Sequence, residues 1–457
     1  MQNQGFSVDL APESLSGLNA AGFFFTLIAV GLLFVLPRRL VLLPFLMAAF
    51  YVPRSQSLEL GPITLPLIRI LIPAGFVRVM MKGESIIGGF KLLDRLMVFW
   101  AVWMMCSGMF HASGVLTTRF GEVCTDLGIY FLCRILIRGL EDIETISRLI
   151  CILLVPVAAG MLLEKLTGRD TWAQFWGESS AVMMRNGHFR ARGPFVHPIL
   201  AGTVGAVCLP MAFYFWRKHR KTALTGFVAG GAIIYACGSS GPIMTAASIF
   251  GALALWRVRS RLRPIRWLTL FLIVALDIVM KDPVYYLIAR LDVSSGSTGW
   301  YRAFFIHSAI EHLSEWWLVG TDFTRGWLPR YLGGSDTSAD ITNHYIQMGV
   351  WGGLPLMFLF VGILLAAFSA IGKLLVRRRN DPFREQFLIW TLGSVLFGHA
   401  VTFLSVSYFD PPIVFLFYFL LGAIGSTYAA IRIDEPVSRC NATPGSDVLP
   451  EPQAFHG

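Results

Sequence analysis

Long apolar segments recur along most of the chain, with short polar or basic stretches between them. A helix needs about 20 apolar residues to cross the roughly 30 Å hydrocarbon core of a membrane. Segments of this kind lie near residues 20–36, 40–53, 62–80, 96–112, 122–137, 149–163, 195–216, 222–237, 240–256, 267–280, 345–368, 386–404 and 411–431. The pattern predicts an all-α integral membrane protein, a polytopic bundle of about 12–13 transmembrane helices.

The composition favours the same class of protein. Of the 457 residues, 55% are hydrophobic and only 14% are charged, and the mean hydropathy is +0.62. A soluble domain of this length needs more polar surface. The net charge is +10, but the basic residues form short clusters between apolar segments, so we do not expect nucleic-acid binding. The seven cysteines form neither a CxxC pair nor a Cys/His cluster, so we expect no zinc site and no disulfide framework.

Four basic clusters predict the orientation of the helices, because basic loops stay in the cytoplasm. These clusters lie at residues 37–39, 217–221, 257–266 and 377–379. The alternation then places two longer loops, 164–194 and 281–344, outside. We divide the chain into an N-terminal segment (1–19), a transmembrane domain (20–433) and a tail (434–457) whose Pro, Ser, Gly and Asp content predicts cytoplasmic disorder. Residues 1–19 contain no Lys or Arg, so we expect no cleavable signal peptide.

The segment 299–320 of the longer loop predicts an amphipathic helix. Its polar side chains gather on one face, and Arg302 falls in the middle of the opposite, apolar face. A helix that lies on a membrane surface carries its arginines on the polar side, so this position predicts a buried anionic partner for Arg302. The alternatives are a structural carboxylate or a side chain that reaches the interface. His307, Glu311 and His312 do not match the spacing of a zinc motif, so we expect no metal there.

A histidine opens the next apolar segment. Asp340, Thr342 and Asn343 are all residue types that cap helix N-termini, which places His344 in the first helical turn. The helix dipole disfavours an imidazolium there. We therefore expect a neutral His344 that can accept a proton or a hydrogen bond. The alternative is an interfacial histidine without a chemical role.

The stretch RARGPFVHPILAG, residues 190–202, places two arginines directly before another apolar segment. We predict His197 in the first turn of that helix, where it supports packing. Arg190 and Arg192 either bind lipid headgroups or, together with Arg302 and His344, surround a ligand on the outer side. Guanidinium groups bind phosphate in a bidentate manner, so the ligand predicted here is a lipid phosphate or pyrophosphate.

Two charges inside apolar segments require partners. We expect Asp277 to pair with Lys281 one helical turn later. Arg69 lies between Pro66 and Pro73, and we expect it either to line a cavity or to pair within the bundle.

Four stretches, in this order, resemble the bacterial O-antigen ligase/polymerase superfamily over roughly residues 180–430. They read FRARGPFVHPILAGTVGAV, CGSSGPIMTAA, GSTGWYRAFFIHSAIEHLSEWWLVGTDF and NHYIQMGVWGGLPLMFLFVGILL. Two positions depart from the family pattern: SSGP replaces a usual SRG at 239–242, and Ile199 replaces an asparagine after His-Pro.

The resemblance implies a transferase of the bacterial inner membrane that acts on the periplasmic face. Its donor is an undecaprenyl-pyrophosphate-linked glycan, which moves to an acceptor hydroxyl without a metal or another cofactor. Arg190 matches the arginine that contacts the pyrophosphate, Arg192 is a neighbour able to substitute for it, and Arg302 matches the arginine of the long loop. His344 matches the histidine that activates or positions the acceptor hydroxyl.

Several assignments stay open on the sequence alone. The acceptor distinguishes a polymerase for O-antigen or exopolysaccharide from a ligase to lipid A-core and from a protein oligosaccharyltransferase, and we favour the polymerase. A chain-length regulator or an export complex is a candidate protein partner. A flippase for lipid-linked glycans shares the helices and the cationic site, but a large one-sided loop favours the transferase. A structural scaffold would leave Arg302 unexplained.

Overall fold

The computed structural model describes residues 17–60, 63–177, 181–290, 299–329 and 338–430. Most of the predicted N-terminal segment 1–19 and the whole predicted tail 434–457 lie outside these residues. Within them the chain is all-α, apart from two antiparallel strand pairs, β1 (Ser57–Leu60) with β2 (Ile63–Pro66) and β3 (Met183–Arg185) with β4 (His188–Arg190).

Each predicted apolar segment contains one helix. These helices are α1 (Ala20–Val35), α2 (Leu42–Tyr51), α3 (Leu67–Met81), α4 (Leu92–Gly108), α5 (Val115–Leu136), α6 (Leu140–Thr167), α8 (Pro198–Phe215), α9 (Arg220–Cys237), α10 (Ser240–Ala254), α11 (Leu262–Val279), α15 (His344–Arg377), α16 (Phe383–Thr402) and α17 (Pro411–Ala430). By length and composition, five helical stretches of the described chain can cross a membrane: α6, α8, 240–261, α15 and α17. This confirms an all-α protein with apolar helices of membrane-spanning length.

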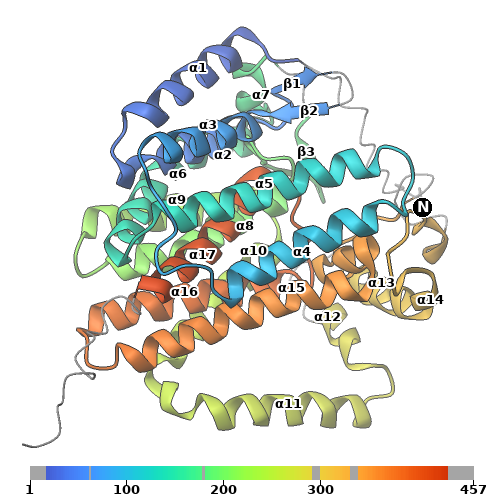
Figure 1. Ribbon diagram of the computed structural model, residues 1–457. Coiled ribbons are helices and arrows are strands. Elements are labelled where there is room, and N and C mark those ends of the chain that lie inside the picture. Colours follow the sequence, from blue (N-terminus) through green and yellow to red (C-terminus); the bar gives the residue numbers. More distant parts are fainter. Residues whose placement is uncertain (1–16, 61–62, 178–180, 291–298, 330–337, 431–457) are drawn as a thin grey trace, which may run out of the picture.

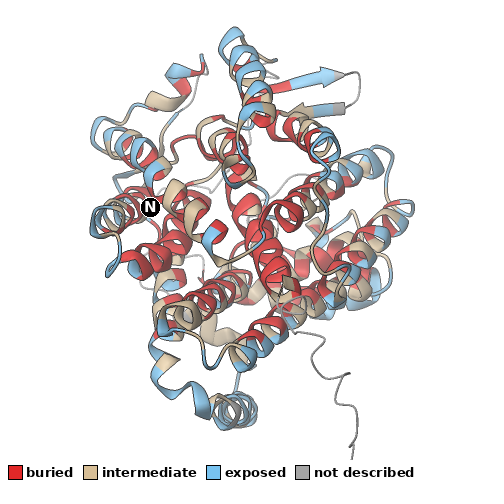
Figure 2. Cartoon of the chain, turned by 60° about the vertical axis from the view of Figure 1, so that its left-hand side comes forward, coloured by how far each residue is buried: buried red, intermediate tan, exposed pale blue. Residues whose placement is uncertain are grey.

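The helices α8 and α17 form the centre of the bundle, and buried residues concentrate there (Figures 1 and 2). Glycines allow α8 to pack closely on its neighbours. A Cβ at Gly202 would lie 2.5 Å from Cys237 Sγ, and one at Gly205 would lie 2.8 Å from the carbonyl oxygen of Gly230. Small residues at helix contacts of this kind permit tight packing inside a membrane.

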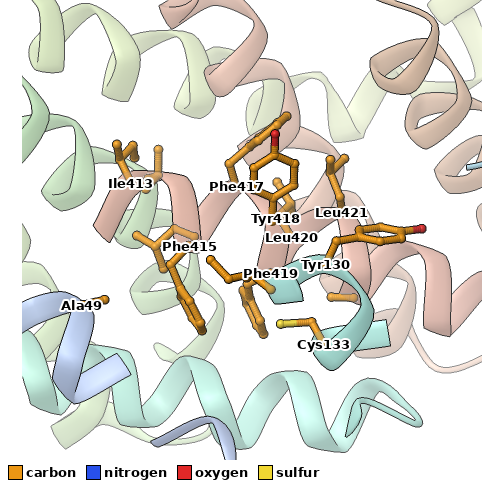
Figure 3. Close-up of a cluster of buried hydrophobic side chains, with 14 of the residues drawn as sticks. Ala49, Tyr130, Cys133, Ile413, Phe415, Phe417, Tyr418, Phe419, Leu420 and Leu421 are labelled. Carbon is orange, nitrogen blue, oxygen red and sulfur yellow. The ribbon is translucent and has the colours of Figure 1, made fainter. Parts of the chain in front are cut away.

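Aromatic side chains of α17 fill the space against α2 and α5 (Figure 3). Beside them a buried ion pair joins α4 to α5, because Arg134 Nε donates to Asp94 Oδ1 over 3.1 Å. The hydroxyl of Tyr130 donates to the same oxygen over 2.6 Å, and Ser426 Oγ of α17 donates to the Arg134 carbonyl. The network satisfies a buried charge and fixes α4, α5 and α17 against one another.

All four basic clusters lie at one end of the bundle. The N-terminal turns of α6 hold two of them, since Asp142 pairs with Arg38 over 2.7 Å and Glu144 pairs with Lys218 over 3.1 Å. Glu144 also binds Arg384 at the start of α16, next to the cluster 377–379. Trp256, next to the cluster 257–266, packs on Phe383 and Phe387 of α16. α6 starts at this end and α15 finishes there, so Glu164, near the end of α6, and His344, at the start of α15, lie at the opposite end.

The predicted outer loops contain more regular structure than expected. The first holds α7 (Thr171–Phe175) and the β3–β4 hairpin. The second holds α12 (Leu287–Arg290), α13 (Gly299–Glu311) and α14 (Leu313–Trp316), with the 3₁₀ turns η3 (Val284–Tyr286) and η4 (Arg325–Trp327). α13 and α14 lie near the start of α15 (Figure 1).

Two sequence predictions in this region are corrected. The single amphipathic helix over 299–320 is broken at His312, whose backbone leaves the helical conformation and whose ring stacks on Trp327. Trp317 therefore stays half exposed, although the helical pattern placed it on the apolar face. Asp277 accepts a hydrogen bond from the backbone N–H of Val284 over 2.8 Å, where the sequence predicted a pair with Lys281.

We expect the two ends of the bundle to lie on opposite sides of a membrane. Arg169→Cys samples the His344 end and Arg220→Cys samples the basic end, and both positions are exposed. In a background in which the exposed Cys106 and Cys124 and the tail residue Cys440 are replaced by serine, a membrane-impermeant thiol reagent applied to spheroplasts should label Arg169→Cys and leave Arg220→Cys unlabelled until the cells are lysed. Equal labelling of both positions before lysis would contradict this arrangement.

Candidate functional site

His344 lines an open pocket among α3, α5, α15 and α17. Most of the lining is apolar or aromatic. The polar residues besides His344 are Arg54, Arg69, Glu122, Thr125 and Asp126, and the aromatic ones are Trp100, Trp351, Tyr408, Phe409, Phe417 and Tyr418. A mostly apolar pocket with a few convergent polar groups is the usual form of a small-ligand site.

The sequence around His344 explains its position. Asn343 is the N-cap of α15, and its side-chain oxygen accepts the backbone N–H groups of Tyr345 and Ile346 over 3.0 and 3.1 Å. Of the three capping residues considered from the sequence, Asn343 is therefore the one that caps. The imidazole is buried and stacks on Phe403, with 4.8 Å between the ring centroids. This packing fixes the plane of the ring.

The hydrogen bonds of the ring determine what it can do. Nδ1 lies 3.0 Å from Gln347 Oε1 and 3.3 Å from the backbone nitrogen of Tyr408. One nitrogen cannot donate to the first and accept from the second, so the contacts describe two neutral tautomers. When Nδ1 donates to Gln347, which is the shorter contact, Nε2 carries a lone pair and can accept a proton.

Arg69 lines this pocket, which is one of the two alternatives that the sequence left open. Its Nε donates to Thr125 Oγ1 over 2.9 Å and its Nη1 to the Thr64 carbonyl over 3.2 Å. The guanidinium crosses α5 at Gly121, where a Cβ would lie 2.5 Å from Nη1. One turn further along α5, Asp126 accepts a hydrogen bond from the Tyr418 hydroxyl over 3.0 Å.

Arg190 and Arg192 lie on a separate feature, which we call the arginine loop (residues 183–197). It begins as the β3–β4 hairpin, whose turn consists of Asn186 and Gly187, both with positive φ. Arg190 ends β4, and its Nε donates to the Cys237 carbonyl over 3.3 Å. Its Nη2 is buried and makes no hydrogen bond to the described part of the protein. Burial and the nearby charge of Arg185 lower the pKa of Arg190 from its usual range.

Hydrogen bonds and an ion pair within the protein fix the position of Arg192. Its backbone N–H and that of Gly193 donate to the two oxygens of the buried Glu164 over 3.0 and 2.8 Å. Its guanidinium Nε lies 3.5 Å from the buried carboxylate of Asp170, and Nη1 lies 3.5 Å from the Val196 carbonyl oxygen. The two arginines thus differ: Arg192 forms an ion pair, whereas Arg190 presents a guanidinium nitrogen without a protein acceptor.

His197 lies one residue before its predicted place in the helix. It is the N-cap of α8, and its Nδ1 accepts the Ile199 N–H over 3.1 Å. Burial and the positive charges of Arg190 and Arg192 lower the pKa of His197 to about 4. The ring therefore stays neutral near pH 7, and its role is structural.

A turn of three residues joins the arginine loop to the His344 pocket. Tyr408 donates its backbone N–H to His344 in one tautomer, and the Phe409 carbonyl accepts from Arg54 Nη1 over 3.2 Å. Next in the turn, the buried Asp410 accepts the Val196 N–H over 3.1 Å. Burial raises the pKa of Asp410 to about 7, although the Val196 hydrogen bond and the charges of Arg54 and Arg192 oppose this shift.

The structure places Arg302 beside Asp340, and Arg302 is not among the described residues that line the His344 pocket. Desolvation raises the pKa of Asp340, while the positive charge of Arg302 acts in the opposite direction. The hydroxyl of the neighbouring Tyr301 donates to the Asp340 carbonyl over 2.7 Å. The charge of Arg302 thus acts on Asp340, in the segment that leads into His344, and the sequence alternatives for the partner of Arg302 stay open.

Several polar residues of the site were missed from the sequence. Glu122 and Asp126 lie inside a predicted apolar segment at a spacing of four residues, and such intramembrane charges mark functional sites by default. The Asn186-Gly187 pair is a strong signal for the hairpin that carries Arg190. Nothing local marks Arg54 or Asp410, because their neighbours come from distant parts of the chain.

No group of three or more His, Cys, Asp or Glu residues in the described part of the chain is arranged to hold a metal ion. His307 pairs with Glu311 over 3.2 Å and with the Tyr285 hydroxyl over 2.9 Å, while His312 turns to the Ser308 carbonyl.

The sequence matches no protein-family model, and no curated protein is significantly similar to it.

The raised pKa of Asp410 predicts a pH-dependent stability. The folded carboxyl keeps its proton up to about pH 7, whereas in the unfolded chain it ionises near pH 3.9. Between these values the folded state binds more protons, so the wild type loses stability as the pH rises. Asp410→Asn removes this loss. The melting temperature of Asp410→Asn minus that of the wild type should increase from pH 4.5 to 7.5 and then level off.

The exposed Glu141 provides the control, since Glu141→Gln should give a flat difference over the same pH range. An equally flat difference for Asp410→Asn would show that its carboxyl ionises alike in the folded and unfolded states.

Proposed function

We propose that the protein is a metal-independent glycan transferase of the bacterial inner membrane. It moves a glycan from undecaprenyl pyrophosphate to an acceptor hydroxyl on the periplasmic side, in the biosynthesis of O-antigen or exopolysaccharide. The observation that carries the proposal is the 408–410 turn. Its Asp410 accepts the N–H of Val196, in the loop that offers Arg190, and its Tyr408 ring packs against His344 in the pocket. The sequence resemblance to the O-antigen ligase/polymerase superfamily supplies the reaction class.

Arg190 is the proposed ligand of the donor pyrophosphate. Its buried Nη2 has no acceptor within the described protein, and a buried guanidinium donor gains most from a charged oxygen. Lys165 lies next to it, because a Cβ at Gly238 would be 3.4 Å from Arg190 Cγ and 3.7 Å from Lys165 Nζ. Two fixed cations stabilise the charge that develops on the leaving pyrophosphate.

His344 is the proposed general base. In the tautomer with Nδ1 donating to Gln347, Nε2 takes the proton of the acceptor hydroxyl. The acceptor oxygen then bonds to the anomeric carbon, and the bond from that carbon to the pyrophosphate oxygen breaks, with its electron pair leaving on the pyrophosphate. Arg302 stays a predicted second pyrophosphate ligand, at the end of the molecule that holds His344.

The remaining parts of the proposal concern the membrane. We propose that the protein has about 12–13 transmembrane helices in the inner membrane, with the basic clusters in the cytoplasm and both outer segments in the periplasm. The polyprenyl chain would then lie along apolar helix faces beside the arginine loop. A polymerase is our first assignment, and a ligase that uses lipid A-core as the acceptor is the alternative.

The reaction can be tested with the purified protein, undecaprenyl-pyrophosphate-linked oligosaccharide and an added acceptor, in the presence of EDTA. A ladder of longer glycans on a gel identifies a polymerase, and a shift of lipid A-core identifies a ligase. His344→Ala should lower kcat by about 10²–10⁴-fold, the usual contribution of a general base. Absence of transfer to every acceptor, or full activity of His344→Ala, would refute the transferase mechanism.

The two arginines should respond differently to substitution. Arg190→Gln should raise KM for the lipid-linked donor about 10–100-fold, the effect of losing a charge-assisted hydrogen bond of about 1.5–3 kcal/mol. Arg192→Gln should lower the melting temperature and leave this KM within about threefold, because its guanidinium pairs with Asp170. Arg220→Gln, at an exposed position of the basic end, serves as the neutral control. The reverse pattern would assign the phosphate to Arg192.

A further inference from the structure

The His344 pocket contains more polar groups than a proton transfer needs. Glu122, Asp126 and Arg69 line it from α5 and α3, and Trp100 lines it from α4. None of them takes part in the reaction described above. Charged residues inside a bundle of apolar helices are costly, so their presence calls for a function.

The charges of this pocket differ from those of the arginine loop. Arg54 and Arg69 bring two positive charges, and Glu122 and Asp126 bring two negative ones, so the formal charges of the lining residues cancel. A pyrophosphate placed here would meet the acidic side chains of Glu122 and Asp126 as well as the two arginines. The pocket is therefore suited to an uncharged polar ligand.

Its hydrogen-bonding groups suit hydroxyls in particular. Asp126 accepts one hydrogen bond from Tyr418 and, as a carboxylate, has room for more. The indole of Trp100 is 1% exposed, and its Nε1 makes no hydrogen bond to the described part of the protein. An unsatisfied buried donor costs about 1–3 kcal/mol, which a ligand oxygen would offset. A sugar hydroxyl can donate to the carboxylates and accept from Trp100 or Arg69.

The pocket also provides apolar surface for a sugar ring. Trp351 and Tyr408 line it together with Tyr418, and aromatic faces pack against the C–H groups of pyranose rings.

We propose that this pocket is the acceptor subsite, and that it binds an uncharged sugar at the end of the acceptor glycan. The inference rests on the proposed transferase function and adds the chemical class of the acceptor. Glu122, Asp126, Arg69 and Trp100 bind ring hydroxyls, while the attacking hydroxyl faces His344. The arginine loop binds the donor phosphates, so donor and acceptor occupy separate subsites joined by the 408–410 turn.

Binding measurements on the full-length protein in nanodiscs separate the two subsites. The first probe is a set of neutral gluco-, galacto- and manno-oligosaccharides, and the second is undecaprenyl pyrophosphate. Asp126→Asn and Trp100→Phe should each lower the affinity for the oligosaccharide that the wild type binds best at least tenfold. Their affinity for undecaprenyl pyrophosphate should stay within about threefold of the wild type. Arg190→Gln should show the opposite pattern. Trp100→Phe keeps an aromatic ring in the core, so it is the variant to test if Asp126→Asn fails to fold.

The outcomes distinguish this inference from the proposed function. Loss of undecaprenyl pyrophosphate binding in Asp126→Asn or Trp100→Phe would overturn the acceptor subsite and assign the pocket to the donor. Absence of binding for every neutral oligosaccharide, or tighter binding of uronic-acid oligosaccharides than of neutral ones, would overturn it as well. If the oligosaccharide binding follows the expected pattern but no glycan is transferred, the sugar site stands and the transferase mechanism fails.

Discussion

The hydrogen bond from the Val196 backbone to the buried Asp410 carboxylate joins the two halves of the candidate site. The Tyr408–Asp410 stretch begins at the His344 ring and ends at the loop that carries Arg190 and Arg192, so one short turn sets the relation between a basic loop and a histidine pocket. Removing this acceptor would leave a buried N–H without a partner and free the loop from the pocket. The distance between the proposed sites of the glycan donor and the glycan acceptor therefore depends on this hydrogen bond.

Some charged side chains around this turn pair with other groups of the protein, and others are proposed to bind ligands. Glu164 accepts hydrogen bonds from the backbone at Arg192, and Asp170 pairs with the Arg192 side chain. The buried Nη2 of Arg190, by contrast, donates to no acceptor within the described residues. In the His344 pocket, positive and negative lining residues balance. This division gives a physical reason for anionic and neutral substrates to bind in different places, because each would be disfavoured in the other's position.

Hydrophobic patterning predicted every long helix, and capping chemistry placed His344 in the first turn of α15, because both signals are local in sequence. The relations among distant residues could not be predicted in the same way. The sequence grouped Arg302 with the other arginines, but the structure gives it Asp340 as a neighbour. Glu122 and Asp126 lie near His344 only because α5 and α15 both pack against α17, which no local pattern encodes.

The central claim is that donor phosphates bind at the arginine loop and not in the histidine pocket. An experimental structure of the protein in a nanodisc with undecaprenyl pyrophosphate would test it directly. The account predicts phosphate oxygens within hydrogen-bonding distance of Arg190 Nη2, with the His344 pocket open for the acceptor. A pyrophosphate between Arg54 and Arg69, with Arg190 making no contact to it, would contradict the account.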